Sequence, residues 1–168
     1  MALLVPDYMF RDVTHISLGF LREKGIKGLV LDVDNTLTGH GSQELGGDVA
    51  AWLEGMRAAG IRLMLASNNT KGRVRPFAEK LGLEYESFCC KPLPLWLLGA
   101  KRRWGLAKKE IALVGDQLFT DLLAGSLYGA RVLVVRPLYE DIKPGVRFKR
   151  HLEKPFLLRY YKKGGTLL

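Results

Sequence analysis

The feature that most constrains the fold is an apolar run that ends in two carboxylates. Residues Leu29–Leu31 favour burial, and Asp32 and Asp34 follow at once on either side of Val33. An ionised carboxylate in an apolar environment is costly unless it is paired or binds a metal. The segment therefore predicts a buried strand with a functional site at its carboxyl end.

Short apolar strands alternate with helical patterns along the chain, which is typical of an α/β protein with a parallel sheet and helices on both faces. Each polar cluster of interest follows the carboxyl end of a strand, where open α/β sheets bind ligands. Strands are expected at about 29–33, 61–66, 84–89, 111–114 and 131–135. Helices are expected at about 12–24, at 48–60 with Asp48 as the N-cap, and at 94–104. Two further helices are expected to follow the polar clusters 67–70 and 115–121 and to end at about 81 and 128.

Length and composition indicate one soluble domain, because 168 residues with 48% hydrophobic and 26% charged residues are ordinary for a globular protein. We divide it into an N-terminal helical segment 1–27, a catalytic core 28–136 and a basic C-terminal extension 137–168. No apolar stretch reaches the length of a membrane span, and Pro6 interrupts the N-terminus too early for a signal-peptide core. A cytoplasmic location is expected.

Most of the net charge of +9 lies near the C-terminus. Between Arg136 and Leu168, nine Lys or Arg residues stand against three acidic ones, which leaves +6 in this segment. Basic residues interleaved with aromatic ones, such as Phe148 and Tyr161, favour peripheral contact with the inner face of an anionic membrane. Nucleic acid is another anionic partner, and a solvated basic surface without any partner is an equally simple interpretation.

Asp32 and Asp34 occupy positions i and i+2 of an extended segment, so their side chains are expected on one side while Val33 faces the core. Two neighbouring carboxylates repel each other unless a cation lies between or beside them. Asp116 and Asp121 follow a later strand and add two acidic ligands. A set of oxygen ligands without His or Cys favours Mg²⁺ over zinc as the cofactor.

Polar residues after two other strands complete this constellation. Lys91 adds a positive charge, and Ser67 adds a donor for an oxyanion together with the amides of the next helix. Asn68 and Asn69 either contact the substrate or cap the helix that begins near Lys71. Because Mg²⁺ also binds phosphate oxygens, this set of residues indicates phosphoryl transfer.

Four motifs thus follow strand ends in sequence order. They are Asp32-Val33-Asp34-Asn35-Thr36-Leu37, Ser67-Asn68-Asn69 with Arg73-Val74, Lys91-Pro92, and Gly115-Asp116-Gln117-Leu118-Phe119-Thr120-Asp121. This order resembles that of the haloacid dehalogenase superfamily, over residues 29 to 121. More narrowly, the chain resembles the YqeG-type subgroup (subfamily IIIA), which is related to mitochondrial phosphatidylglycerophosphate phosphatases. The resemblance implies a Rossmann-like three-layer α/β/α fold with Mg²⁺ as cofactor.

The resemblance also implies residue roles. Asp32 would be the nucleophile that forms an aspartyl-phosphate, and Asp34 would transfer protons to the leaving group and from the water. Arg73 and Arg75 could reach an anionic substrate, but the sequence does not place them. The implied metal ligands are Asp32, the backbone carbonyl of Asp34, and Asp116, with Asp121 as a helper ligand or a group that supports the ligands. The implied phosphoryl contacts are Ser67, Lys91, Asn68 and Asn69.

The gaps after Leu37 and Asn69 are too short for the large cap domain that this superfamily often inserts. An open site suits a bulky substrate, so we expect a phosphomonoesterase and take phosphatidylglycerophosphate as the first substrate hypothesis. A soluble sugar phosphate or a nucleic-acid 3′-phosphate is the alternative. A phospho-Asp receiver-like signalling module and a basic nucleic-acid-binding protein fit less well, since neither needs all four motifs.

Overall fold

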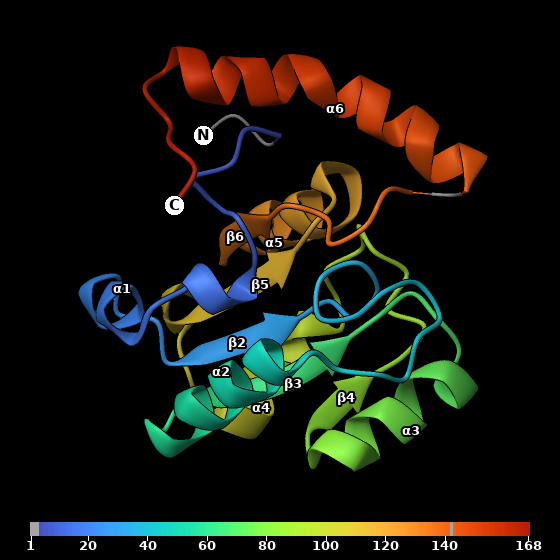
Figure 1. Cartoon of the computed structure of the whole chain (residues 1–168). Coiled ribbons are helices and arrows are strands. Elements are labelled where there is room, and N and C mark those ends of the chain that lie inside the picture. Colours follow the sequence, from blue (N-terminus) through green and yellow to red (C-terminus); the bar gives the residue numbers. More distant parts are fainter. Residues whose placement is uncertain (1–3, 142) are drawn as a thin grey trace.

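The computed structural model describes residues 4–141 and 143–168, so the first three residues of the predicted segment 1–27 lie outside the described part. Within it, parallel strands form one sheet in the order β1-β6-β5-β2-β3-β4, with helices packed around it (Figure 1). This arrangement confirms the predicted α/β class. The strands are β1 (Tyr8–Phe10), β2 (Gly28–Leu31), β3 (Arg62–Ala66), β4 (Glu84–Glu86), β5 (Ile111–Gly115) and β6 (Arg131–Val135).

Helices cover both faces of the sheet, because successive strand residues point alternately into two separate cores. Leu29 and Leu31 of β2 belong to the core shared with α1, α2 and α3, whereas Val30 belongs to the core shared with α4, α5 and α6. The three-layer α/β/α prediction is therefore confirmed. The helices are η1 (Val13–His15), α1 (Leu18–Glu23), α2 (Gly47–Ala58), α3 (Lys71–Leu81), α4 (Leu97–Trp104), η2 (Lys108–Glu110), η3 (Leu118–Leu122), α5 (Leu123–Tyr128) and α6 (Pro144–Lys162).

The strand order reverses between β2 and β5. From β2 the chain continues to β3 and β4 on one side, and it then returns to β5 and β6 on the other side. In open α/β sheets, ligands bind in the crevice at the carboxyl ends of the strands where the order reverses. The residues that follow β2 and β5 therefore occupy the position that this fold favours for a site.

No cap domain covers this crevice in the described residues, as the sequence predicted. The segment between β2 and α2 is a loop, and only α3 and β4 lie between Ser67 and Lys91. The loop folds back toward the crevice, since the N–H of Gly41 donates a hydrogen bond to the Asp34 carboxylate at 2.8 Å.

Two predicted helix boundaries in the first half of the chain are wrong. The helix expected over 12–24 is split into η1 and α1, because Ser17 is extended and its Oγ accepts a hydrogen bond from the N–H of Phe20 as a new N-cap. Asp48 is not the N-cap of α2, since Gly46 holds that position. Asp48 lies in the first turn instead, where a carboxylate still faces the positive end of the helix dipole.

Strand β4 ends at Glu86, three residues before its predicted end. Cys90 has a φ of 52°, in the left-handed region, and the N–H of Cys89 donates to the carbonyl of Ser67 at 3.1 Å. The backbone therefore leaves the sheet and turns onto the loop that follows β3. This turn carries Lys91 to the crevice.

Two later helices begin differently from expectation. The helix expected over 94–104 begins at Leu97, because residues 95–96 form a turn. The helix expected up to 128 opens with the π-helical segment η3 before it continues as α5. The wider π-helical turn matters for the site, because Asp121 lies within it.

Strand β1 and helix α6 were not predicted. The C-terminal end of the chain pairs with β1, since the N–H of Leu168 donates to Met9 and the N–H of Arg11 donates to Leu168, both at 2.9 Å. Tyr160 of α6 is buried in the same core as Met9, and Figure 1 shows α6 along the β1 and β6 side of the molecule. Among the helices described, α6 included, none combines the length and apolar character needed to cross a bilayer.

Candidate active site

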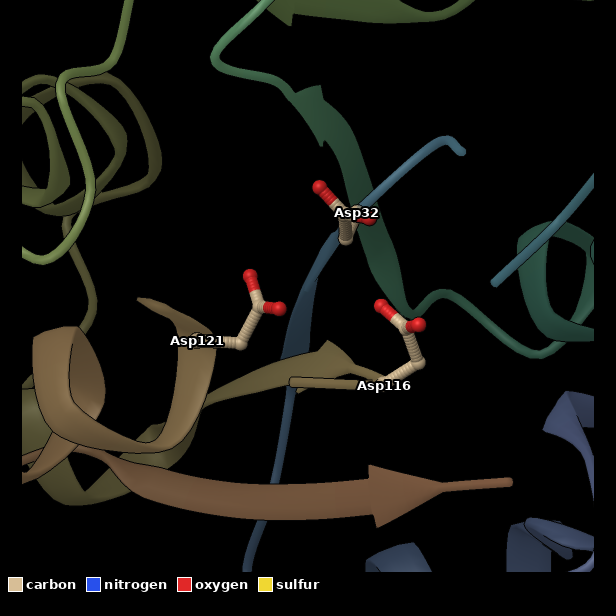
Figure 2. A group of neighbouring side chains, drawn as sticks. All are labelled: Asp32, Asp116 and Asp121. Atoms are coloured by element: carbon tan, nitrogen blue, oxygen red, sulfur yellow. The ribbon is translucent and has the colours of Figure 1, made fainter. Parts of the chain in front are cut away.

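Three carboxylates converge at the carboxyl ends of β2 and β5 (Figure 2). Asp32 directly follows β2, Asp116 directly follows β5, and Asp121 extends from η3. One oxygen atom of each carboxylate lies within 4.8 Å of the others. Asp121 can approach so closely because residue 115 is glycine, and a Cβ on Gly115 would overlap the Asp121 side chain. The structure thus brings together three of the four predicted acidic ligands.

Lys91 lies against this group of carboxylates. Its Nζ donates to Oδ1 of Asp32 at 2.5 Å and to Oδ1 of Asp121 at 2.7 Å, and its side chain is only 2% exposed. Burial alone would lower the pKa of Lys91, but the charges of Asp121 and Asp32 outweigh burial and raise that pKa above its ordinary value. The structure thus places Lys91 in the crevice, where the two carboxylates favour its charged form.

When all three are ionised, the carboxylates outnumber the side-chain cations that contact them in the described part of the chain. Asp32, Asp116 and Asp121 contact Lys91 and one further cation, the guanidinium of Arg150. Burial, together with the neighbouring carboxylates, raises the pKa of Asp32 to about 8 and that of Asp116 to about 7, against the opposing effects of Lys91 and Arg150. A buried group of oxygen ligands with surplus negative charge fits a divalent cation such as Mg²⁺.

The Asp34 carboxylate is not part of this group, although the sequence placed it beside Asp32. Strand β2 ends at Leu31, so the alternation of an extended strand does not continue to Asp34. Its Oδ1 accepts hydrogen bonds from the Gly41 N–H at 2.8 Å and from Nη2 of Arg73 at 3.1 Å, and its Oδ2 accepts one from Nδ2 of Asn69 at 2.5 Å. Three donors thus orient Asp34 toward the loop and α3.

Asn68 and Asn69 do not cap α3, so that alternative is wrong. Thr70 is the N-cap residue, and no side chain accepts a capping hydrogen bond there. Asn69 binds Asp34 instead. Asn68 holds the backbone of Lys91, because its Oδ1 accepts from the Lys91 N–H at 2.7 Å and its Nδ2 donates to the Lys91 carbonyl at 3.2 Å. Asn68 therefore positions Lys91.

Ser67 is buried at the end of β3, where the sequence expected it. Its Oγ accepts a hydrogen bond from the N–H of Asn69 at 3.1 Å, so the hydroxyl proton is free to donate elsewhere. The two arginines that the sequence left unplaced separate clearly. Arg73 binds Asp34, whereas Arg75 is exposed and pairs with Glu79 along α3.

Sequence reasoning missed the contribution of the C-terminal extension. Arg150 of α6 contacts Asp116, and it also contacts Asp141 and Glu153. One signal was available: Glu153 is the single acidic residue of α6, three positions after Arg150, which is the spacing of a helical ion pair. Asp141 and its contact with His40 at 2.9 Å had no comparable signal, because they join distant segments.

This fold and this set of carboxylates define a hydrolase of the haloacid dehalogenase class. The sequence model of the haloacid dehalogenase-like hydrolases matches residues 42–129, which is more than half of the chain, and a model described as mitochondrial PGP phosphatase matches residues 1–81. The chain therefore belongs to the haloacid dehalogenase-like hydrolases, and the prediction that it is an enzyme of this family is confirmed.

Similar proteins add detail to this family assignment. The chain is 32% identical to the "Probable phosphatase YqeG" of Bacillus subtilis, over 95% of this chain and 93% of that protein. It is 26% identical to "Phosphatidylglycerophosphate phosphatase 1, chloroplastic/mitochondrial" of Arabidopsis thaliana, of which it spans 49%. Among solved structures, it resembles the cobalt-bound deoxy-D-mannose-octulosonate 8-phosphate phosphatase of Haemophilus influenzae with a TM-score of 0.52 and 13% identity, covering 79% of this chain and 88% of that one. This last similarity concerns the fold alone.

Proposed function

We propose that this enzyme is a Mg²⁺-dependent phosphomonoesterase that works through an aspartyl-phosphate intermediate. The observation that carries the proposal is the buried group of Asp32, Asp116 and Asp121 with Lys91, at the point where the strand order reverses. A phosphate ester brings more negative charge to a group that already has a surplus. Such a site needs both the fixed ammonium and a divalent cation, which is the usual requirement of phosphoryl transfer.

In this proposal, an oxygen of Asp32 attacks phosphorus, a bond between Asp32 and the phosphoryl group forms, and the bond to the substrate oxygen breaks. Asp34 donates a proton to the leaving alkoxide and then accepts one from the water that hydrolyses the intermediate. Lys91 and the hydroxyl of Ser67 bind the phosphoryl oxygens. Bound Mg²⁺ would neutralise phosphoryl charge, and the residues that would hold it are Asp32, Asp116 and Asp121 with the backbone carbonyl of Asp34.

The contacts of Asp34 support its separate role. Its carboxylate is held by Gly41, Asn69 and Arg73, apart from the group of Asp32, Asp116 and Asp121, so it is available for proton transfer in this proposal. Asn69 and Arg73 act on the reaction through Asp34 in this proposal. We therefore propose that Asn68 positions Lys91 and that Asn69 positions Asp34, in place of the direct substrate contact implied by the resemblance.

The test uses p-nitrophenyl phosphate, whose leaving group needs no proton. We expect Asp32→Asn to give no product, because the nucleophile is lost. Asp34→Asn should release one equivalent of nitrophenolate in a burst and then stall, because hydrolysis of the intermediate needs the base. Asp48→Asn, an exposed carboxylate of α2, is the matched control. Steady turnover by Asp32→Asn would refute the mechanism.

For the substrate, we propose phosphatidylglycerophosphate, as the names of two relatives suggest. The absence of a cap in the described residues supports a bulky substrate. A panel of phosphomonoesters with phosphatidylglycerophosphate in mixed micelles, sugar phosphates and a 3′-phosphorylated oligonucleotide decides the point by kcat/KM. A higher kcat/KM for a soluble ester than for the lipid would overturn the lipid proposal and leave the mechanism intact.

The outer face of α6 supports peripheral contact with an anionic membrane. Phe148 is 65% exposed and Leu152 is 46% exposed, one helical turn apart on the same face. Exposed basic residues surround them, while Glu153, the single acidic residue of the helix, is buried. An exposed helix face that combines apolar and basic side chains binds the interface of anionic lipid bilayers.

Sedimentation with vesicles tests this contact. We expect the protein to bind vesicles that contain phosphatidylglycerol more tightly than vesicles of phosphatidylcholine alone. Substitution of both Phe148 and Leu152 by Ser should weaken that binding without changing the turnover of p-nitrophenyl phosphate. Leu127→Ser, which removes an exposed apolar side chain from α5, is the control. Equal binding by the double variant and the unchanged protein would rule the contact out.

A further inference from the structure

We propose that Arg150 of the C-terminal helix α6 is a positioning residue of the active site, which orients Asp116 for binding of the divalent cation. This inference rests on the proposed function, because it assigns Asp116 to that cation. Neither family model reaches α6, since the two end at residues 129 and 81. The assignment therefore comes from the contacts of this chain alone.

The guanidinium of Arg150 contacts Asp116 twice. Its Nη2 donates to Oδ2 of the carboxylate, and its Nη1 donates to the backbone carbonyl of Asp116 at 2.5 Å. The Asp116 side chain is fully buried, and the Arg150 side chain is 20% exposed. Because the planar guanidinium presents several donors in fixed directions, one side chain sets both the backbone and the carboxylate orientation of Asp116.

Other contacts hold the guanidinium itself. Its Nε donates to Asp141 at 2.8 Å, and its Nη1 donates to Glu153 at 3.1 Å. Glu153 in turn accepts a hydrogen bond from the N–H of Leu118 at 2.7 Å, at the start of η3. Arg150 is thus fixed from both α6 and the loop before it, and it has little freedom left to lose when a cation binds.

The other side of Asp141 reaches the loop that carries the nucleophile. Oδ1 of Asp141 accepts a hydrogen bond from Nδ2 of Asn35 at 3.1 Å, and the same oxygen lies 2.9 Å from Nε2 of His40. The backbone N–H of Tyr139 also donates to Oδ1 of Asn35 at 2.9 Å. The segment before α6 is therefore tied to the same loop that follows Asp32.

The two carboxylate oxygens of Asp116 have different contacts. Arg150 occupies Oδ2, whereas Oδ1 lies 3.5 Å from Oγ1 of Thr36, which is also 3.5 Å from Oδ2 of Asp32. Oδ1 is therefore the oxygen turned toward Asp32. Because Arg150 already fixes this orientation, the Asp116 carboxylate loses little rotational freedom when a cation binds at Oδ1, and this opposes the weakening effect of the nearby positive charge.

Calorimetric titration of Mg²⁺ into the full-length protein tests the proposal without reference to activity. We expect Arg150→Met and Arg150→Lys each to weaken binding about 10-fold to 100-fold, the usual effect of losing a residue that orients a metal ligand. Arg150→Lys keeps the charge, so it isolates the guanidinium geometry. Added guanidinium ion should restore part of the affinity of Arg150→Ala, which a merely structural role would not allow.

Leu157→Ala is the matched control, because Leu157 is an apolar residue of α6 that packs this helix against the core. We expect it to lower the thermal stability and leave the Mg²⁺ affinity unchanged. Unchanged affinity in the Arg150 variants, or an equal loss in Leu157→Ala, would overturn the proposal. If the unchanged protein binds Mg²⁺ but hydrolyses no phosphomonoester, the proposed function fails while calorimetry still decides the role of Arg150.

Discussion

Substitutions of Lys91 and Asp121 should differ in their effect on the stability of the metal-free protein, although the two residues form one ion pair. Lys91→Met leaves Asp32, Asp116 and Asp121 together in a buried group, with Arg150 as the one remaining side-chain cation in contact with them among the described residues. Two unit charges 4 Å apart interact with roughly 4 kcal/mol at an effective dielectric constant near 20, and both contacts of Lys91 are closer than that. Part of this loss is offset because a carboxyl can bind a proton, so we expect a net loss of about 3–5 kcal/mol, the usual effect of breaking a buried pair.

Asp121→Asn removes a negative charge that Asp32 and Asp116 repel, and it leaves the 2.5 Å contact between Lys91 and Asp32 in place. The free energy of unfolding without metal should therefore not fall. Unfolding by urea in EDTA at neutral pH, followed by tryptophan fluorescence, measures both variants. For a chain of this size the loss in Lys91→Met corresponds to a decrease in Tm of about 6–20 °C. An equal decrease in Asp121→Asn would contradict the surplus of negative charge in this group.

Two other predictions concern the same group. The raised pKa values of Asp32 (about 8) and Asp116 (about 7) lie above their ordinary value of 3.8, so the folded state holds extra protons between these limits. The metal-free protein should therefore lose stability as the pH rises from about 4 to about 8, and saturating Mg²⁺ should abolish that loss. Urea unfolding at several pH values, with and without Mg²⁺, measures both effects. A free energy of unfolding that does not change with pH in the metal-free protein would contradict the prediction. Gly115→Ala should displace Asp121 by steric overlap and weaken Mg²⁺ binding, which calorimetry measures; unchanged affinity would show that Asp121 is not a ligand.

The sequence predicted the centre of the site because its chemistry follows the strands. Asp32 and Asp116 come directly after β2 and β5, and these strands are neighbours in the sheet. Lys91 follows β4, two strands away from β2, and the turn at Cys90 carries it back to the crevice. A strand end and a charged residue type are both visible in sequence, so these residues could be found without knowledge of the tertiary contacts.

The orientation of Asp34 could not be predicted in this way. The rule that residues i and i+2 share a face holds only inside a strand, and β2 ends at Leu31. Asn35 has a φ of 64°, so the backbone turns directly after Asp34. Its side-chain partners on α3 and on the loop lie 7 to 39 positions away in sequence. Where a strand ends by a tertiary turn, local periodicity gives no information about the next side chain.

The C-terminal extension shows why net charge alone is a poor guide to function. Its basic residues suggest one anionic partner, but α6 directs them to two different surroundings. Arg150 points inward to Asp116, whereas the outer face that carries Phe148 and Leu152 is exposed. Removal of residues 137–168 would abolish both contacts and would also expose the core beneath Tyr160. Lost activity after such a truncation therefore cannot distinguish membrane contact from positioning of Asp116, and only substitutions confined to one face of α6 separate the two.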